Sequence, residues 1–278
     1  MTTPQISFEF FPPKTKEGEI KLNSVCTELA ALHPAFFSVT YGAGGVTQEG
    51  TLQTVRNIQD IGQAVAPHLS CVGASTAQLH SLLTTYRQQG IRQLVALRGD
   101  LPSGMGQYGA LQHADQLVSF IREQTGDWFH IHVAAYPEFH PQARSSHEDI
   151  QRFANKMKAG ANSAITQYFF NKEAYFRFID EAHKLGVESP IIPGIMPIIN
   201  SHHLLRFSAV CGADIPRWIR LRLLDYADDT RSIRAFGLDV VNRLCEDLLT
   251  GGAPGLHFYT LNQAEIILKI NHTLSSLL

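Results

Sequence analysis

Residues 6–13 read ISFEFFPP, an apolar run that carries a single carboxylate, Glu9, and is ended by two prolines. A short run that is apolar at almost every position is typical of a parallel strand buried on both faces. The next stretch, about residues 17–32, has apolar residues mostly three and four positions apart, which predicts an amphipathic helix. The chain therefore begins with one strand–helix unit.

The same alternation of short apolar runs and amphipathic segments continues along the chain, without a linker or a break in composition. Further strands are predicted at residues 36–41, 66–72, 93–97, 131–136, 163–170, 191–197 and 256–261. Further helices are predicted at residues 47–62, 76–89, 113–124, 147–159, 172–185, 202–210 and 263–274. A longer helical insertion, at about residues 213–252, precedes the last strand.

Eight strand–helix units in 278 residues predict an α/β fold, a closed (β/α)8 TIM barrel that forms one domain over residues 1–278. The pattern alone leaves a doubly wound open sheet as the alternative, because that fold is built from the same units.

Composition and charge restrict the class of protein. The formal net charge is −2 and no block of Lys or Arg stands out, so nothing indicates a nucleic-acid partner. No apolar run reaches the ~18 residues that indicate a membrane span, and no signal peptide is visible. The 4 cysteines lie far apart, which suits reduced thiols in a cytoplasmic protein. The 13 histidines are scattered without zinc spacing, so no metal site is expected.

Chemistry in a (β/α)8 barrel gathers at the C-terminal ends of the strands. Polar side chains stand near most of the predicted strand ends, and this joint placement favours an active site over an ordinary polar rim. These residues are Glu9, Thr40, His68, Arg98, Asp100, Tyr136, Glu138, His140, Gln167 and Asn262.

Glu9 lies between Phe8 and Phe10 in the sequence, so its carboxyl group should be desolvated and its pKa raised. A carboxylic acid with a raised pKa can donate a proton near neutral pH. A structural glutamate, bound to a neighbouring backbone group or to an interior lysine or arginine, fits the local sequence equally well. Asp100 is either a carboxylate beside a cofactor or cationic intermediate, or a cap on the following loop.

Other segments also have two interpretations. The glycine-rich turn at residues 42–45 could hold a phosphate through backbone N–H groups, although it matches neither the Rossmann nor the P-loop motif. The aromatic and rigid segment YPEFHP at residues 136–141 suits stacking on a flat ring. Taken alone, His68 is most simply a core or rim histidine, and Phe207 a core residue beside Leu204.

These strand ends carry motifs that resemble the methylenetetrahydrofolate reductase family. They follow the family's order from Glu9 to Asn262, and together they are highly specific although each is weak alone. The matching segments are EFFPPK (9–14), VTYGAGG (39–45), PHLSC (67–71), ALRGDLP (96–102), AAYPE (134–138), AGAN (159–162), ITQ (165–167), IPGI (192–195) and HFYTLN (257–262).

The resemblance implies a (β/α)8 barrel that binds FAD without a covalent bond. Hydride would pass from NADH or NADPH to FAD, and then to 5,10-methylenetetrahydrofolate, giving 5-methyltetrahydrofolate. Glu9 matches the acid that opens the folate ring, and Asp100 matches a residue beside the flavin and the pterin. A cytoplasmic homo-oligomer, with no membrane or nucleic-acid partner, is expected.

The resemblance also assigns contact residues. Cofactor contacts are expected at Thr40, Tyr41, Ala43, His68, Arg98, Gly99, Asp100, His113, Ala114, Tyr136, His140, Asp149, Asn155 and Lys156. Folate contacts are expected at Gln167, His203, Phe207 and Gln263.

Some positions depart from the family's pattern. His113-Ala114 stands where the family has Tyr-Ala, and Arg152 and Asn155 replace residues that contact FAD in relatives. His203 and Gln263 stand where relatives can have Gln and Arg in contact with folate. The departures concern the adenine and phosphate contacts and the fit to the folate tail.

Three other classes of protein are weighed against a flavin reductase. A Schiff-base aldolase or lyase needs an inward lysine at a strand end, and no predicted strand has one. A non-catalytic flavin or pterin-binding protein would have no use for a buried acid at Glu9. A metal-dependent hydrolase would need His-x-His or paired carboxylates at the strand ends, and these are absent from the sequence.

Overall fold

A computed structural model describes residues 4–41, 48–99 and 109–278 of the chain. Its strands form one sheet in which all paired neighbours are parallel, in the order β7-β6-β5-β4-β3-β2-β1-β9-β8. The strands are β1 (Gln5–Phe10), β2 (Phe37–Val39), β3 (Val65–Ser70), β4 (Gln93–Leu97), β5 (His130–Ala135), β6 (Ser163–Thr166), β7 (Ile191–Ile192), β8 (Gly194–Ile195) and β9 (Gly255–Tyr259).

The sheet closes into a barrel through the two short strands β7 and β8, which are separated only by Pro193. β7 pairs with β6, whereas β8 pairs with β9. Proline has no N–H to donate to a ladder, which explains why the single strand predicted at residues 191–197 is divided. The backbone N–H of His257 donates to the Pro193 carbonyl at 3.0 Å across this junction. The predicted (β/α)8 barrel is therefore confirmed, and the open sheet is excluded.

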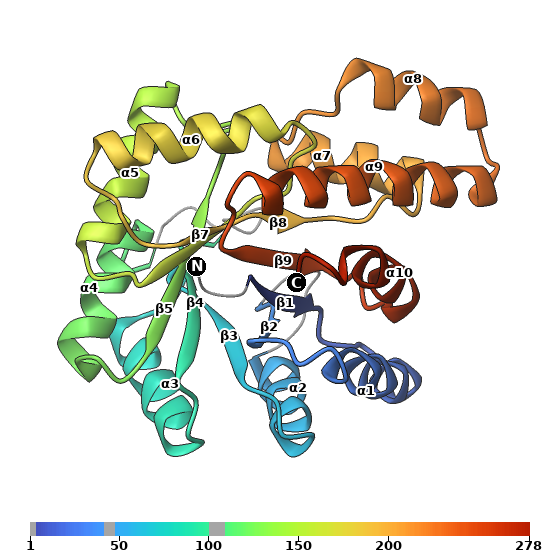
Figure 1. Cartoon of the computed structure of the whole chain (residues 1–278). Helices are drawn as coiled ribbons and strands as arrows, with labels where there is room; N and C mark the ends of the chain where they lie inside the picture. Colours follow the sequence, from blue (N-terminus) through green and yellow to red (C-terminus); the bar gives the residue numbers. More distant parts are fainter. Residues whose placement is uncertain (1–3, 42–47, 100–108) are drawn as a thin grey trace.

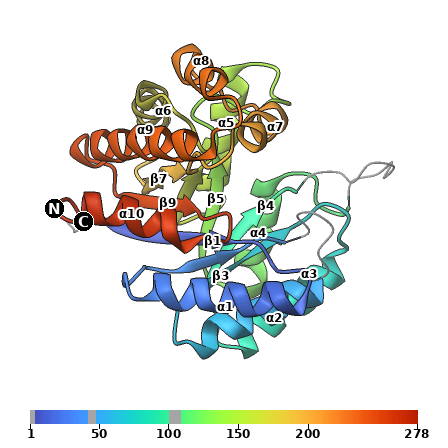
Figure 2. The ribbon, with the colours of Figure 1, turned by 90° about the vertical axis from the view of Figure 1, so that its right-hand side faces the viewer.

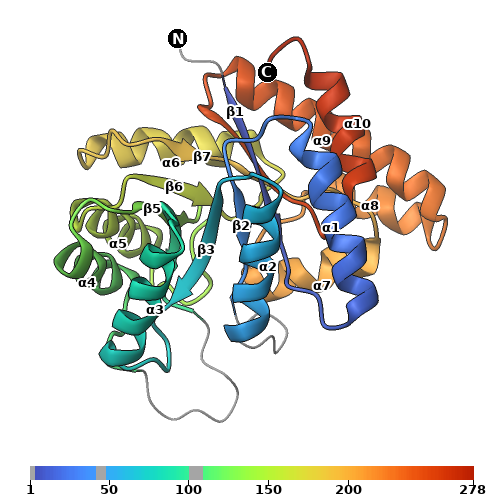
Figure 3. The ribbon, with the colours of Figure 1, turned by 90° about the horizontal axis from the view of Figure 1, so that it is seen from below.

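Helices surround the barrel and follow the strands in sequence (Figures 1 and 3). Side-chain caps fix several of their first residues; Ser75, for example, caps the third helix through the N–H of Gln78. These helices are α1 (Lys16–Ala30), α2 (Gln48–Asp60), α3 (Thr76–Gln88), α4 (Ala114–Thr125), α5 (Ser146–Lys158), α6 (Lys172–Lys184), α7 (Ser201–Cys211) and α10 (Ala264–Leu274).

The helical insertion before β9 contains two helices, α8 (Arg217–Tyr226) and α9 (Thr230–Thr250), where the sequence pattern predicted one long helical segment. The chain breaks at Ala227, whose φ of 47° is incompatible with a continuing right-handed helix. Asp229 then caps α9 by accepting from the N–H groups of Arg231 and Ser232. In Figures 1 and 2, α8 lies outside α9, at the edge of the molecule.

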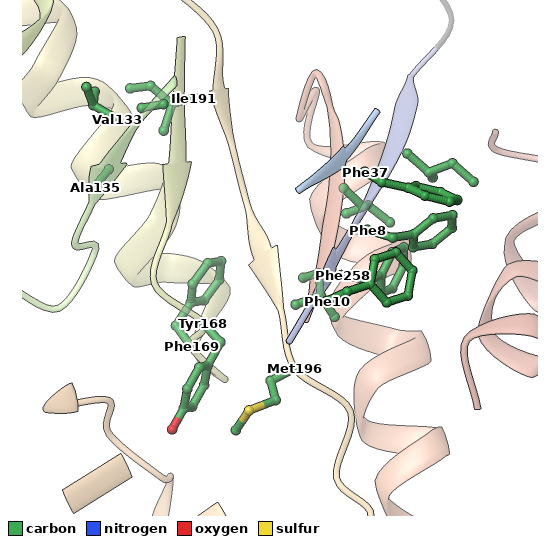
Figure 4. Close-up of a cluster of buried hydrophobic side chains, with 14 of the residues drawn as sticks. Phe8, Phe10, Phe37, Val133, Ala135, Tyr168, Phe169, Ile191, Met196 and Phe258 are labelled. Atoms are coloured by element: carbon green, nitrogen blue, oxygen red, sulfur yellow. The ribbon is translucent and has the colours of Figure 1, made fainter. Parts of the chain in front are cut away.

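Alternation along β1 divides its side chains between two environments. Phe8 and Phe10 pack with Phe37 between the sheet and the helices, with ring centroids 5.8 and 5.1 Å from that of Phe37. Figure 4 shows these rings together with Phe258. Because successive side chains of a strand point to opposite faces, Glu9 points to the other face, into the barrel.

Candidate active site

Glu9 is the centre of a polar cluster inside the barrel. Its carboxylate oxygen Oε2 lies 3.1 Å from Nε2 of His68 on β3 and 3.6 Å from Nε2 of His257 on β9. The Ser38 hydroxyl on β2 donates to the same oxygen at 3.4 Å. Only 11% of the Glu9 side chain is exposed. Residues from three other strands thus meet one buried carboxylate.

The pKa of Glu9 is lowered in this cluster, from 4.5 to about 2. Burial is the largest single influence and raises the pKa, but the charge of His68 and the hydrogen bonds from His257 and His68 together outweigh it. The sequence-based prediction of a raised pKa is therefore wrong for this structure. That prediction rested on Phe8 and Phe10, which point away from the carboxylate, whereas its true neighbours come from distant strands.

His257 and Ser7 extend the cluster deeper into the barrel. His257 is fully buried, and its Nδ1 lies 2.7 Å from the Ser7 hydroxyl oxygen. No role was predicted for Ser7, Ser38 or His257, although His257 begins the HFYTLN motif. The period of two along β1 could have indicated Ser7, because it shares the inner face with Glu9.

A further histidine, His132 on β5, lines the barrel interior below the strand ends. His132 is buried, with Nδ1 2.7 Å from the Ser163 hydroxyl and Nε2 3.0 Å from the Gln93 amide oxygen. Burial and the nearby histidines hold the pKa of His132 well below its usual value. The His132 ring also stacks on Phe36, at 4.5 Å between centroids. These contacts identify His132 as a neutral part of the core.

A cavity of about 820 Å³ opens at the C-terminal ends of β4 and β5, beside α4 and α5. It brings together nine of the residues predicted to contact the cofactor, from four separate segments of the chain. They are Arg98, Gly99, His113, Ala114, Tyr136, His140, Asp149, Asn155 and Lys156.

Internal contacts order the polar side chains of this cavity. Arg98 donates to the Gln142 amide oxygen at 2.6 Å, and Asp149 accepts from the backbone N–H of His140 at 2.9 Å. Lys156 donates to the Ala134 carbonyl, and burial lowers the pKa of Lys156 to about 8. Arg98 and Lys156 therefore hold cationic N–H donors in fixed positions at the wall of the cavity.

Gly99 has a structural reason to be glycine. Its φ is 86°, a conformation that side chains rarely adopt, and a Cβ there would clash with the Ser70 hydroxyl. That hydroxyl donates to the Arg98 carbonyl at 2.9 Å, so the turn holds Arg98 in place beside the cavity.

The remaining predicted cofactor residues lie elsewhere or outside the described residues. Thr40 and Tyr41 directly follow β2, and the Thr40 N–H donates to the Phe10 carbonyl at the end of β1. The buried Thr40 hydroxyl has no hydrogen-bond partner within residues 4–41, 48–99 and 109–278. Ala43 and Asp100 fall outside those ranges, so the roles assigned to them remain predictions.

The predicted folate residues lie at the ends of β6 and β9 and on α7. Gln167 directly follows β6 and is half-buried, whereas Gln263 stands at the N-cap position of α10 without a side-chain capping hydrogen bond. On α7, His203 and Phe207 are exposed and their ring centroids lie 6.3 Å apart. Leu204 is buried but Phe207 is 38% exposed, so core packing, the simplest interpretation of Phe207, is wrong. The helix turns this ring away from the core.

Asn262, at the end of β9, has a structural role. Its side chain accepts from the Phe11 N–H and donates to the Phe11 carbonyl, each at 2.9 Å. This pair of bonds joins the C-terminal ends of β1 and β9 at Phe11, two residues after Glu9. The contact fixes the strand that carries the carboxylate.

Two kinds of site are not found in the described part of the chain. No group of three or more His, Cys, Asp or Glu side chains there could hold a metal ion. No helix there is long and apolar enough to span a membrane.

The family model for methylenetetrahydrofolate reductase matches residues 1–275. The chain is 40% identical to the 5,10-methylenetetrahydrofolate reductase of Escherichia coli K12, over 97% of this chain and 90% of that protein. It is 36% identical to a probable methylenetetrahydrofolate reductase (NADH) of Oryza sativa subsp. japonica, over 95% of this chain but 47% of the plant protein.

A solved structure shares the fold. It is an uncharacterized protein from Clostridium thermocellum that binds two copies of 5-methyl-5,6,7,8-tetrahydrofolic acid, with a TM-score of 0.68. The match covers 99% of this chain and 95% of that chain at 20% identity, which supports the barrel alone.

The stability of the protein in acid should depend on whether Glu9 is ionised. Because its pKa falls from 4.5 to about 2 on folding, ionised Glu9 stabilises the fold at neutral pH, by about 3 kcal/mol at most. This contribution is complete above the unfolded pKa and is lost as the pH falls towards about 2. In urea unfolding from pH about 6 to about 3, the advantage of the parent over Glu9→Gln should therefore shrink.

A raised pKa would give the opposite trend, because protonation would then relieve the cost of a buried charge. An advantage that grows as the pH falls would contradict the pairing of Glu9 with the two histidines. Glu17→Gln, which removes an exposed carboxylate on α1, controls for the general effect of losing one acidic group.

Proposed function

The chain belongs to the methylenetetrahydrofolate reductase family, and from this premise we propose that it reduces 5,10-methylenetetrahydrofolate to 5-methyltetrahydrofolate. In this proposal FAD is bound without a covalent bond, NADH or NADPH supplies the hydride, and Glu9 takes part in proton transfer. The observation that carries the proposal is the convergence of nine predicted cofactor residues on one cavity at the strand ends, next to the barrel that holds Glu9.

The cavity has the donors that a flavin dinucleotide requires. A diphosphate needs cationic or N–H donors, which Arg98 and Lys156 offer. Asn155 and His113 add polar groups for the rest of the dinucleotide. The unpartnered Thr40 hydroxyl supplies a further buried polar atom at the strand end. When bound, FAD would accept and pass on the hydride.

In the proposed reaction, the chain's own residues carry out the proton transfer. The five-membered ring of the folate must open before it accepts hydride, and opening requires protonation of the leaving nitrogen. Glu9 alone, with a pKa of about 2, carries almost no proton at neutral pH. However, the His68 and His257 imidazoles lie 3.1 and 3.6 Å from its Oε2, close enough to exchange a proton with it. We assign the acid role to this cluster, with Glu9 passing on a proton that it receives from a neighbouring imidazole.

FAD binding is tested on the purified protein. It should be yellow and release FAD on denaturation. Arg98→Ala should lower the FAD content and weaken the binding of added FAD, because a guanidinium offers paired donors to phosphate or ring oxygens. Arg243→Ala, at an exposed position on α9, is the matched control. A colourless parent that does not bind added FAD would overturn the cofactor assignment, and unchanged binding by Arg98→Ala would overturn the role of Arg98.

Gln167 should bind the pterin and not the flavin. An amide both donates and accepts, which matches the mixed edge of a pterin ring. Gln167→Ala should weaken folate binding, measured by calorimetry, by about 1–3 kcal/mol, the usual cost of an unpaired buried polar group. Its FAD content should equal that of the parent. Loss of FAD with normal folate affinity would reverse the assignment.

A further inference from the structure

Two histidines inside the barrel are held by serines in the same way. Nδ1 of His257 lies 2.7 Å from the Ser7 hydroxyl oxygen, and Nδ1 of His132 lies 2.7 Å from the Ser163 hydroxyl oxygen. All four side chains are buried. The two rings differ in what their other nitrogen faces, so one pair serves as a reference for the other.

His132 is held as a neutral ring with its proton on Nε2. This nitrogen lies 3.0 Å from the Gln93 amide oxygen, which can only accept and therefore requires an N–H. Nδ1 then carries a lone pair, to which the Ser163 hydroxyl donates. Burial and the nearby histidines keep the pKa of His132 well below its usual value, which agrees with a neutral ring.

The same reasoning places the proton of His257 on Nε2. Within the residues that the structure describes, the Ser7 hydroxyl bonds only to Nδ1 of His257, so its proton has an acceptor only if it donates there. A neutral ring with a lone pair on Nδ1 carries its proton on Nε2. This nitrogen lies 3.6 Å from Oε2 of Glu9 and 3.4 Å from the Ser38 hydroxyl, which donates to the same Oε2. The N–H therefore points at the Glu9 carboxylate.

His257 has no route by which it could replace a lost proton. Its side chain is 0% exposed, Ser7 occupies its Nδ1, and the Phe36 ring stacks on it with centroids 5.8 Å apart. The His68 side chain is 10% exposed, and its Nε2 lies 3.1 Å from the same carboxylate oxygen. A group that gives up a proton in every reaction cycle must regain one from water, and of the two rings only His68 reaches the surface.

We propose that Ser7 and His257 position the Glu9 carboxylate for the reaction, and that the proton which Glu9 passes on comes from His68. This inference rests on the proposed function, because it divides the acid role within the Glu9 cluster. In the proton step, an N–H bond of protonated His68 breaks as an O–H bond forms on Glu9. That O–H bond breaks as the leaving nitrogen of the folate takes the proton, and His68 regains one from water. His257 keeps its proton on Nε2 throughout.

The position of the His257 proton is measured by nitrogen NMR of labelled histidine rings in the purified full chain, which requires no turnover. Between pH about 6 and about 8, where histidines usually change charge, the ring should carry a proton on Nε2 and none on Nδ1. Its signals are those lost in His257→Gln or, if that variant does not fold, those that move most in Ser7→Ala. A proton on Nδ1 in the parent would contradict the proposal.

Stopped-flow absorbance of the flavin tests the positioning role. Ser7→Ala should slow reoxidation by 5,10-methylenetetrahydrofolate about tenfold or more, comparable to the loss when the group that orients a metal-bound histidine is removed. Flavin reduction by NADH or NADPH and the affinity for the folate should match the parent. Ser163→Ala, which removes the same 2.7 Å contact from His132, is the matched control and should keep the parent rate.

Equal reoxidation rates for Ser7→Ala and Ser163→Ala would show that Ser7 has no positioning role. A parent whose reduced flavin is not reoxidised by the folate would instead contradict the proposed function. In that case the NMR measurement still decides whether Ser7 fixes the His257 proton on Nε2.

Discussion

A buried carboxylate is costly unless charges or hydrogen-bond donors surround it, and the inside of this barrel is organised around that requirement at Glu9. His68, Ser38 and His257 come from β3, β2 and β9 to meet the Oε2 atom. Ser7 in turn binds His257. Each partner depends on the strand register, in which Ser7 lies beside His257 and Glu9 beside Ser38. A shift of the β1 register by one residue would turn Glu9 towards the aromatic core and leave His68 and His257 without the carboxylate.

The proposed reductase chemistry uses two regions that the barrel joins. One is the Glu9 cluster inside the sheet, and the other is the cavity beside α4 and α5. Three of the positions that depart from the family's pattern, His113, Arg152 and Asn155, line this cavity. Arg152 pairs with Glu148 at 2.8 Å, and its guanidinium lies 3.4 Å from Nδ1 of His113. Arg152 and His113 contact each other, and in the proposed function we expect them to bind the adenine and phosphate end of FAD together.

Local patterns predicted most of the fold, because capping, periodicity and apolar runs act over short distances. Residues 93–97 form β4 as predicted, and α3 begins at Thr76 because Ser75 caps it. Features that depend on distant partners were missed or misjudged. The pKa of Glu9 is set by strands far along the chain, and the exposure of Phe207 by how α7 sits on the barrel. The break at Ala227 was missed, although Asp229, which caps α9, could have indicated the start of a new helix. Similarly, the motifs identified Glu9 and His68, whereas the strand register places Ser38 beside Glu9 and His257 beside Ser7.

In the proposed function, the Glu9 cluster serves folate reduction and not flavin reduction. Stopped-flow absorbance of the flavin in Glu9→Gln tests this claim most directly. Glutamine keeps the shape of the side chain but cannot pass on a proton. Reduction of the flavin by NADH or NADPH should proceed at nearly the parent rate. Its reoxidation by 5,10-methylenetetrahydrofolate should be slower by about 10²–10⁴-fold, the usual contribution of a general acid. If Glu9→Gln is reoxidised by the folate as fast as the parent, Glu9 is a structural carboxylate and the claim is wrong.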